Sequence, residues 1–198
     1  MQERKREVIL GSSSMVRRAL SKRLGFPIKY ASPDFQENHD EALAPVDMAR
    51  LYSMGKAKSL SSSFAHALII GADQTAEDDL GLLTKPSSLS QVKEQLVRLS
   101  GKEHQLHSGL ALWDDSLGTC LTEVVTVNLR MRPLTEEMID NYLSKDNPVG
   151  CVGGYVFEEH GYLLFEEVCG AEEGAISGLP MVTLASLLRK QGLDSLLL

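Results

Sequence analysis

The feature that most constrains the fold is a short apolar run that leads into an isolated acid. Residues 67–70 read Ala-Leu-Ile-Ile, which is typical of a buried strand, and Asp73 follows closely. We expect this strand to end near Gly71. The polar segment 77–81 ends in glycine and predicts a tight reversal, whose return arm brings Lys85 back towards Asp73. Together, this acid and lysine could hold a metal-bound phosphate, although a solvated hairpin with surface charges fits the same residues.

The start of the chain offers a second candidate phosphate site. Residues 8–10 are apolar and predict a strand, a Gly-Ser-Ser-Ser loop follows at 11–14, and a helical pattern then carries Arg17 in its first turn. Ser13 or Ser14 is the natural N-cap. Free backbone N–H groups, hydroxyls and a guanidinium at such a junction can bind one anion. The sequence contains neither a P-loop nor a dinucleotide-binding glycine pattern, and a capped helix with a solvated basic face is the alternative.

Composition and charge limit the possible partners. The 198 residues carry a formal net charge of −7, which argues against a nucleic-acid polymer as the main partner, because such binders usually present a basic face. A small phosphate ligand needs only a local group of cations. We find no apolar run that would cross a membrane or form the core of a signal peptide. The cysteines are widely spaced, so we expect reduced thiols in a cytoplasmic protein, with one domain over residues 1–198.

The remaining pattern predicts an α/β protein with a mixed, twisted sheet flanked by helices, in two lobes with a ligand cleft between them. A helix over 45–60 should face Leu51 inwards, and solvent exposure is the ordinary expectation for Lys56 on the same helix. A capping box at Ser88 begins a helix that should bury Leu89. The other expected elements are strands at 28–31, 105–113, 119–129 and 162–165, and helices that follow Thr135 and begin at Pro180.

Two loop segments hold further candidate ligand groups. Asp34 and Glu37 lie in a loop over 32–38, and either carboxylate could bind a hard cation, although a single loop acid is more often a surface charge. The small residues of 149–155 would let the backbone approach a ligand, or they form a tight packing turn. His107 lies among apolar residues, so we expect a hydrogen-bonded core histidine rather than a base.

Several of these segments form a recognisable series. In chain order they are Leu10-Gly11-Ser12-Ser13-Ser14 with Arg17 and Arg18, the acidic loop 32–37, Leu51 to Lys56-Ala57, Gly71-Ala72-Asp73-Gln74, Lys85-Pro86, 96–102, His107-Ser108-Gly109 and Ser177-Gly178-Leu179-Pro180. The series spans nearly the whole chain and resembles the Maf proteins. These are nucleoside triphosphate pyrophosphatases related in fold to the inosine triphosphatases. Such a series is much more specific than any one of its motifs.

The resemblance implies hydrolysis of a nucleoside triphosphate to the monophosphate and pyrophosphate. It implies a divalent metal, Mg²⁺ first and Mn²⁺ or Co²⁺ as alternatives, and it suggests a homodimer. By the same similarity, Asp73 accepts the proton of the attacking water, and Glu37 and Asp73 help to hold the metal. These roles agree with the charge of a triphosphate and with the lower pKa of metal-bound water. The residues expected to bind the phosphates are Ser12, Ser14, Arg17, Lys56 and Lys85.

Base choice within the family is set by three positions, which here are Val16, Gln74 and Glu158. Gln74 and Glu158 resemble the branch that acts on 7-methyl-GTP. A carboxylate at Glu158 can accept hydrogen bonds from a guanine edge and suits a ring that methylation has made cationic. Val16 departs from this branch, which often has an aromatic stacking partner at that position. Met15 and Asn38 also differ from the proline and threonine that are usual in the family.

Two other functions stay open from the sequence. A haloacid-dehalogenase-type phosphatase also uses an Asp after a buried strand, but its usual second acid would stand at position 75, which is Thr75. A nucleotide-binding regulator of cell division would bind through the same residues without metal-dependent turnover. The products separate these functions, because a phosphatase releases orthophosphate and a pyrophosphatase of this kind releases pyrophosphate.

Overall fold

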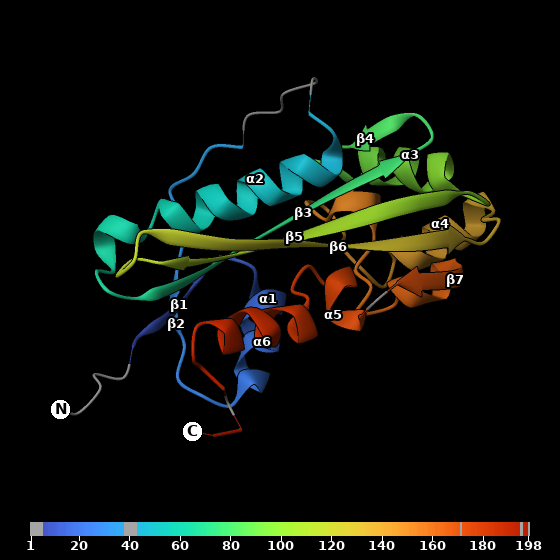
Figure 1. Ribbon diagram of the computed structural model, residues 1–198. Coiled ribbons are helices and arrows are strands. Elements are labelled where there is room, and N and C mark those ends of the chain that lie inside the picture. Colours follow the sequence, from blue (N-terminus) through green and yellow to red (C-terminus); the bar gives the residue numbers. More distant parts are fainter. Residues whose placement is uncertain (1–5, 38–42, 171, 195, 198) are drawn as a thin grey trace.

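The computed structural model describes residues 6–37, 43–170, 172–194 and 196–197. Within this part of the chain, seven strands form one continuous mixed sheet (Figure 1). β1 runs parallel to β2 and β3, whereas β3, β5, β6 and β7 pair antiparallel in turn. The predicted mixed sheet is therefore confirmed. In sheet order the strands are β2 (Lys29–Ala31), β1 (Val8–Gly11), β3 (Leu68–Asp78), β5 (Glu103–Asp114), β6 (Thr119–Met131) and β7 (Phe165–Gly170), with β4 (Gly81–Leu83) paired to β3.

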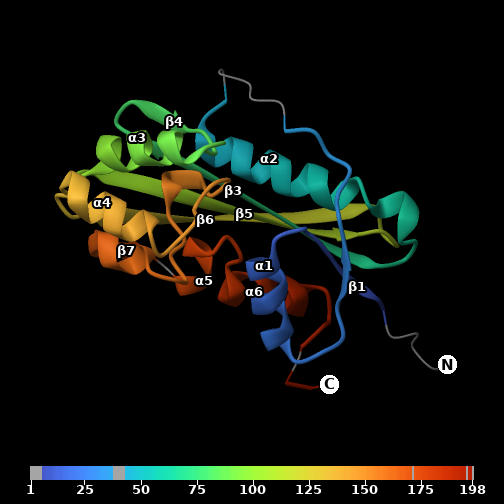
Figure 2. The same cartoon turned by 180° about the vertical axis from the view of Figure 1, so that it is seen from behind.

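Helices cover both faces of this sheet. Helix α2 (Pro45–Lys58) crosses one face, while α1 (Met15–Ser21) and α6 (Met181–Lys190) lie together against the other, as the view from behind also shows (Figure 2). The end of the molecule that carries β4 and β7 holds α3 (Leu89–Leu99), α4 (Glu136–Leu143) and the short α5 (Glu173–Ile176). Short 3-10 helices connect these elements at Lys22–Leu24, Ser61–Ser63, Val152–Gly154 and Gly161–Leu164.

Alternating side chains of β3 divide the core between the two faces of the sheet. Leu68, Ile70 and Ala72 pack in the cluster that includes α6, whereas Ile69 packs with Ala57 of α2 in a second cluster. Because both faces of β3 are covered, the strand is apolar on both sides, as the run at 67–70 predicts. A third cluster fills the space around α3 and α4. Fully burying a Leu or Ile side chain, such as Leu68 or Ile70, stabilises the fold by about 1.5–3 kcal/mol relative to leaving it exposed.

Gly71 allows α2 to approach β3 closely. A Cβ atom added to Gly71 would lie 2.0 Å from the carbonyl oxygen of Ser53 and 2.8 Å from the backbone nitrogen of Ala57. Real Cβ contacts are not this short, so only glycine permits the observed packing. The close approach places Lys56, which lies between these two helix residues in sequence, directly over the strand that carries Asp73.

The strand that carries Asp73 is longer than the sequence predicts. β1 pairs with β3 only as far as Gly71, but β5 pairs with β3 from Leu68 to Glu77. The predicted end near Gly71 is therefore wrong, because antiparallel pairing to β5 continues the strand through Asp73. Among the described residues, no strand pairs with the other edge of β3 between Gly71 and Ala76. This open edge is where a cleft forms.

Of the other predicted strands, three are confirmed and one is wrong. Residues 28–31, 105–113 and 119–129 are confirmed as strands with shifts of a few residues at their ends. The prediction at 162–165 is wrong, because Gly161–Leu164 forms a 3-10 helix and β7 begins only at Phe165. Tyr162 and Leu163 are about half exposed, so the apolar run there does not mark a buried strand.

The helix signals are confirmed at their starts and less well along their faces. Ser14, Ser88 and Thr135 each accept a hydrogen bond from the backbone N–H three residues later. Leu51 and Leu89, predicted to face inwards, are 40% and 50% exposed. Helix α6 begins at Met181, with Pro180 as the preceding residue, and α5 was not predicted. No described helix is long and apolar enough to cross a membrane.

Candidate active site

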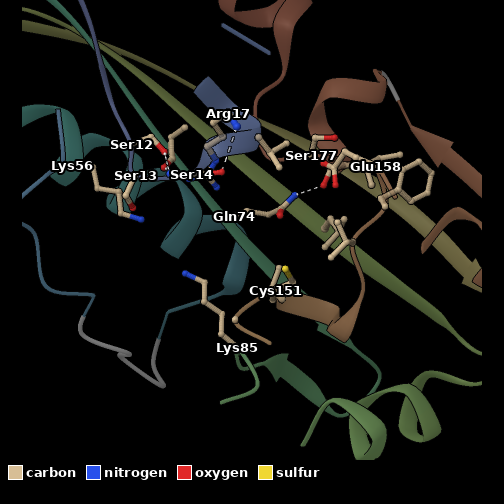
Figure 3. A pocket seen from close by; sticks show the side chains of 18 of the residues that line it. Ser12, Ser13, Ser14, Arg17, Lys56, Gln74, Lys85, Cys151, Glu158 and Ser177 are labelled. Atoms are coloured by element: carbon tan, nitrogen blue, oxygen red, sulfur yellow. Dashed lines mark hydrogen bonds between the residues drawn. The ribbon is translucent and has the colours of Figure 1, made fainter. Parts of the chain in front are cut away.

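A cleft of about 490 Å³ opens at the free edge of β3. Its walls come from the Gly-Ser loop with the start of α1, the loop 32–37, α2, β3, the arm after β4, residues 150–158 and the end of α5 (Figure 3). This volume lies within the range of small-molecule sites. Every predicted nucleotide-binding residue lines it, together with one predicted metal ligand: Ser12, Ser14, Val16, Arg17, Lys56, Gln74, Lys85, Glu158 and Glu37.

Lys56 joins the two predicted metal ligands. Its Nζ donates to Glu37 Oε1 at 2.6 Å and also to Oδ1 of Asp73. The Lys56 side chain is only 11% exposed, so the expectation of solvent exposure is wrong. A buried ammonium is costly unless it is paired, and here two carboxylates satisfy it. The close contact between α2 and β3 at Gly71 is what brings these groups together.

Glu37 is held by two cations from different segments. Lys85, on the arm after β4, approaches Glu37 Oε2 at 3.4 Å. Partial burial raises the pKa of Glu37, but the hydrogen bond and charge of Lys56, together with Lys85, outweigh it and leave the pKa below its ordinary value. The carboxylate is thus ionised at neutral pH. The sequence predicts that Lys85 returns towards Asp73; in the structure Lys85 bonds to Glu37 and lines the same recess as Asp73.

The loop that carries Glu37 packs directly on α2. A Cβ added to Gly55 would lie 2.2 Å from a ring carbon of Phe35, so the aromatic ring takes the space that a side chain would fill. The Phe35 ring also lies 5.8 Å from the ring of Tyr52. Gly55 is helix-weakening by propensity, and its packing role explains why α2 tolerates it. Asp34, the other candidate acid of the loop, is exposed, and Asn38 lies outside the described residues.

Arg17 supplies a third cation from the opposite wall. Its Nη1 donates to the carbonyl oxygen of Ala72 at 2.9 Å. Burial lowers the pKa of Arg17, and the negative charges of Asp73 and Glu37 oppose that change. A guanidinium stays protonated in either case. Three cations from three separate segments therefore face the same cleft.

The serine loop is ordered by its own hydroxyl groups. Ser14 Oγ accepts from the Arg17 backbone N–H at 3.3 Å, and Ser12 Oγ accepts from the Ser14 N–H at 3.2 Å. These bonds hold the backbone in a tight arc at the end of β1. Ser12, Ser13 and Ser14 all line the cleft, where a phosphate oxygen could accept from their hydroxyls.

Asp73 lies beneath the main cleft. Its side chain is 2% exposed, and it lines an adjoining recess of about 150 Å³. Glu37, Gln74 and Lys85 line both spaces, so the recess and the cleft adjoin each other at these three residues. Thr75, the position that a dehalogenase-type phosphatase would use for an acid, instead donates its hydroxyl to the carbonyl oxygen of Pro45 at 2.7 Å.

Gln74 is oriented by its amide nitrogen. Nε2 donates to the carbonyl oxygens of Ala175 and Ile176 at 2.9 Å each and to Ser108 Oγ at 3.1 Å. Because these neighbours include two backbone carbonyls, the nitrogen must face them and Oε1 is the free end. None of the described residues donates to this oxygen. Gln74 therefore offers the cleft a hydrogen-bond acceptor.

The end of the cleft around Glu158 is more apolar than the phosphate end. Val16 and Glu158, two of the three positions expected to set base choice, both line the cleft, together with further side chains. The sequence signals for this wall are Glu158, the small-residue stretch 149–155 and the motif that begins at Ser177, and none of them points to Phe157. The additional lining residues are Leu106, Cys151, Tyr155, Val156, Phe157, Ile176 and Ser177.

His107 lies outside this site. Its Nδ1 contacts Thr126 Oγ1 and its Nε2 contacts Glu77 Oε1, each at 2.9 Å. The side chain is almost entirely buried between β3, β5 and β6. The prediction of a hydrogen-bonded core histidine is confirmed.

The mixed sheet and a cleft where three cations gather beside Glu37, with Asp73 in the adjoining recess, define an α/β protein built to bind a small polyanion. Residues 7–191 match the family model described as Maf-like protein, so the chain belongs to the Maf family, as the resemblance indicates. Its relatives include proteins named 7-methyl-GTP pyrophosphatase. That of Syntrophotalea carbinolica is 36% identical over 91% of this chain and 92% of its own length. Those of Hahella chejuensis and Pseudomonas putida are 38% and 34% identical, with 94% and 93% of this chain and 94% and 96% of their own lengths covered.

Proposed function

We propose that this protein hydrolyses a nucleoside triphosphate to the monophosphate and pyrophosphate, with a 7-methylated guanine nucleotide as substrate. The observation that carries the proposal is the gathering of Arg17, Lys56 and Lys85 with Glu37 in the cleft and of Asp73, bonded to Lys56, in the recess beside it. A triphosphate needs several cations that arrive from different directions, and pyrophosphate needs the same cations as it leaves. The names of the relatives supply the reaction and the base.

In this proposal Asp73 acts as the general base. It accepts a proton from the water as the water oxygen bonds to the α-phosphorus. The bond from that phosphorus to the oxygen bridging to the β-phosphoryl group breaks, and the leaving pyrophosphate carries the new negative charge. Arg17, Lys56 and Lys85 stabilise that charge from three sides of the cleft. Lys56 already bonds to Asp73, so it would also hold the carboxylate in position for the water. The serine hydroxyls of the first loop donate to phosphate oxygens.

The residues present fit a divalent metal ion. Glu37 and Asp73 both direct an oxygen at a single cationic centre, the Lys56 ammonium. Among the described residues no group of three acidic, histidine or cysteine side chains forms a closed metal site. Mg²⁺ does not require one, since it usually binds through one or two carboxylates, with phosphate oxygens and waters completing its shell. When bound, the ion would lower the pKa of its water and neutralise phosphate charge. We propose Mg²⁺, with Mn²⁺ and Co²⁺ as alternatives.

The base would occupy the end of the cleft that Glu158 and Gln74 line. Both present acceptors, Gln74 through Oε1 and Glu158 through its carboxylate. The Watson–Crick edge of guanine carries two adjacent donors, N1–H and the N2 amino group, whereas adenine and uracil place a donor beside an acceptor. Two acceptors therefore favour guanine. The negative charge of Glu158 further favours a ring that carries the positive charge of N7 methylation.

A nucleotide panel tests the proposal. The purified protein is incubated with 7-methyl-GTP, GTP, ATP and UTP, with Mg²⁺ or with a chelator, and pyrophosphate and orthophosphate are measured separately. We expect pyrophosphate with Mg²⁺, fastest with 7-methyl-GTP, and none with the chelator. Orthophosphate as the first product would support the phosphatase alternative. Nucleotide binding without any turnover would support the regulator. The homodimer, the cytoplasmic location and the single domain over 1–198 stay predictions.

A further inference from the structure

Glu158 lies on a short turn that closes on itself. The backbone N–H groups of Glu159 and Gly161 both donate to the carbonyl oxygen of Val156, at 3.3 and 2.9 Å. Glu158 is at the exposed tip of this turn, and its carboxylate points into the cleft (Figure 3). A tip of this kind has few contacts of its own, so its position depends on what holds the two ends of the turn.

Both ends of the turn are held from α4 and the segment that follows it, because Tyr142 lies in the last turn of α4 and Asp146 comes after the helix has ended at Leu143. The Val156 N–H donates to the hydroxyl of Tyr142 at 2.9 Å. At the other end, the His160 N–H donates to Asp146 Oδ2 at 3.0 Å, and His160 Nδ1 lies 2.7 Å from Asp146 Oδ1. The backbone N–H of Asp146 donates to the Tyr142 carbonyl at 3.1 Å, so the two side chains follow each other on one helical turn.

The two holding side chains form one buried polar group. Tyr142 and Asp146 are 5% and 6% exposed, whereas the turn they hold reaches the surface. Burial is the main cause that raises the pKa of Tyr142, and the charge of Asp146 with a hydrogen bond to it acts in the same direction. The hydroxyl therefore keeps its proton and can donate towards Asp146 while it accepts from Val156. Buried networks with every member satisfied hold their parts rigidly.

We propose that Tyr142 and Asp146 are positioning residues that determine base preference, because they hold Glu158 against the base. This inference rests on the proposed contact between Glu158 and the base. Neither residue lines the cleft, and neither lies on an element that carries Arg17, Lys56, Asp73 or Lys85. Loosening the turn should therefore weaken recognition of the base and leave the phosphate chemistry as it is.

The test is a double-mutant cycle between Asp146→Ala and Glu158→Ala. The readout is kcat/KM for 7-methyl-GTP divided by kcat/KM for UTP. Asp146→Ala should lower this ratio about three- to tenfold, roughly the factor that one hydrogen bond contributes. The change should come from a higher KM for 7-methyl-GTP with kcat nearly unchanged. In the Glu158→Ala background the same substitution should have no further effect on the ratio, because it acts through Glu158.

Two further variants keep the test independent of folding. Tyr142→Phe removes one hydroxyl and keeps the buried ring, and it should shift the ratio in the same direction. Asp146→Asn keeps an acceptor for the His160 N–H and should restore most of the preference. The matched control is Asp140→Ala, which removes a nearby carboxylate, on α4 itself, that bonds to Lys93 on the surface. It should leave the ratio unchanged.

The outcomes separate the two proposals. An unchanged ratio in both Asp146→Ala and Tyr142→Phe overturns this inference alone. A further loss of preference when Asp146→Ala is added to Glu158→Ala also overturns it, since the effect would then not pass through Glu158. If Glu158→Ala by itself leaves the ratio unchanged, the proposed base contact fails, and this inference fails with it.

Discussion

The ammonium of Lys56 lies in the protein interior, where a charge without a partner of opposite sign would be unstable. This group is nearly buried, and Glu37 and Asp73 both bond to it. Breaking a buried charge pair by removing one partner typically costs about 3–5 kcal/mol, because the other charge is left uncompensated. The three side chains thus form one unit. A substrate phosphate that binds Lys56, or a metal ion that binds Glu37 and Asp73, would replace contacts within it. Substitutions at Asp73 should keep its shape to separate chemistry from folding.

Asp73→Asn should keep the fold and nearly abolish turnover. The amide has the same shape, and its oxygen can still accept from Lys56, but it cannot take a proton from water. General-base catalysis contributes about 100- to 10,000-fold, so pyrophosphate release should fall by a factor in that range. Asp34→Asn is the matched control, because Asp34 is an exposed acid of the nearby loop. A turnover rate in Asp73→Asn close to that of the wild type would remove Asp73 as the base.

Helix α2 depends on packing more than on its own ends. Its N-cap residue, Ala44, makes no side-chain capping hydrogen bond, in contrast to the serine and threonine N-caps of α1, α3 and α4. Its stability comes from the face that rests on β3 and β5, and this contact is closest at Gly71. The same contact holds Lys56 over Asp73, so helix packing and site geometry are coupled.

Gly71→Ala should therefore weaken both stability and activity. The added methyl group meets backbone atoms of Ser53 and Ala57, which cannot move aside separately. Overpacking of this kind typically costs about 1–3 kcal/mol, measured as a lower free energy of unfolding in urea. Gly11→Ala on the paired strand is the comparison, because its nearest neighbour is the movable end of the Leu60 side chain at 2.9 Å. An equal fall in the free energy of unfolding in the two variants would contradict the role assigned to the α2 contact.

Over the whole molecule, the sheet is continuous while the apolar core is divided into three clusters. Two clusters lie on opposite faces of the half that carries β1, and the third fills the half around α3 and α4. His104 is buried in this third region, where its ring lies 5.7 Å from that of Tyr155 and 5.8 Å from that of Phe165. Its Nε2 bonds to the Tyr155 hydroxyl at 2.8 Å, and Nδ1 has no partner among the described residues.

His104 should make stability depend on pH. Burial lowers the pKa of His104 to about 4, well below its ordinary value of 6.5. Between these values the unfolded chain binds a proton and the folded chain does not, so the unfolding free energy should fall as pH drops from 6.5 towards 4. The contribution is complete above pH 6.5 and amounts to about 3 kcal/mol. Urea unfolding from pH 4 to 7 measures it, and His104→Gln should flatten this part of the curve. An unchanged slope in that variant would contradict the assignment.

Local signals predicted the elements well where the cause is local. Ser14, Ser88 and Thr135 cap helices because a short hydroxyl side chain satisfies the free N–H groups of the first turn. The strand prediction at 162–165 is wrong because an apolar run alone does not distinguish a strand from a 3-10 helix. The prediction that Leu51 and Leu89 face inwards is wrong because neighbouring elements leave those positions uncovered.

By itself, the sequence determined the mixed α/β fold, the family and the residue types of the site, since these follow from periodicity, caps and the order of motifs. Only the tertiary structure decided that Lys56 is buried between Glu37 and Asp73, that β3 continues through Asp73, and that Tyr142 and Asp146 hold the turn of Glu158. The physical reason is distance along the chain. These contacts join segments far apart in sequence, so their geometry depends on how closely the helices pack on the sheet.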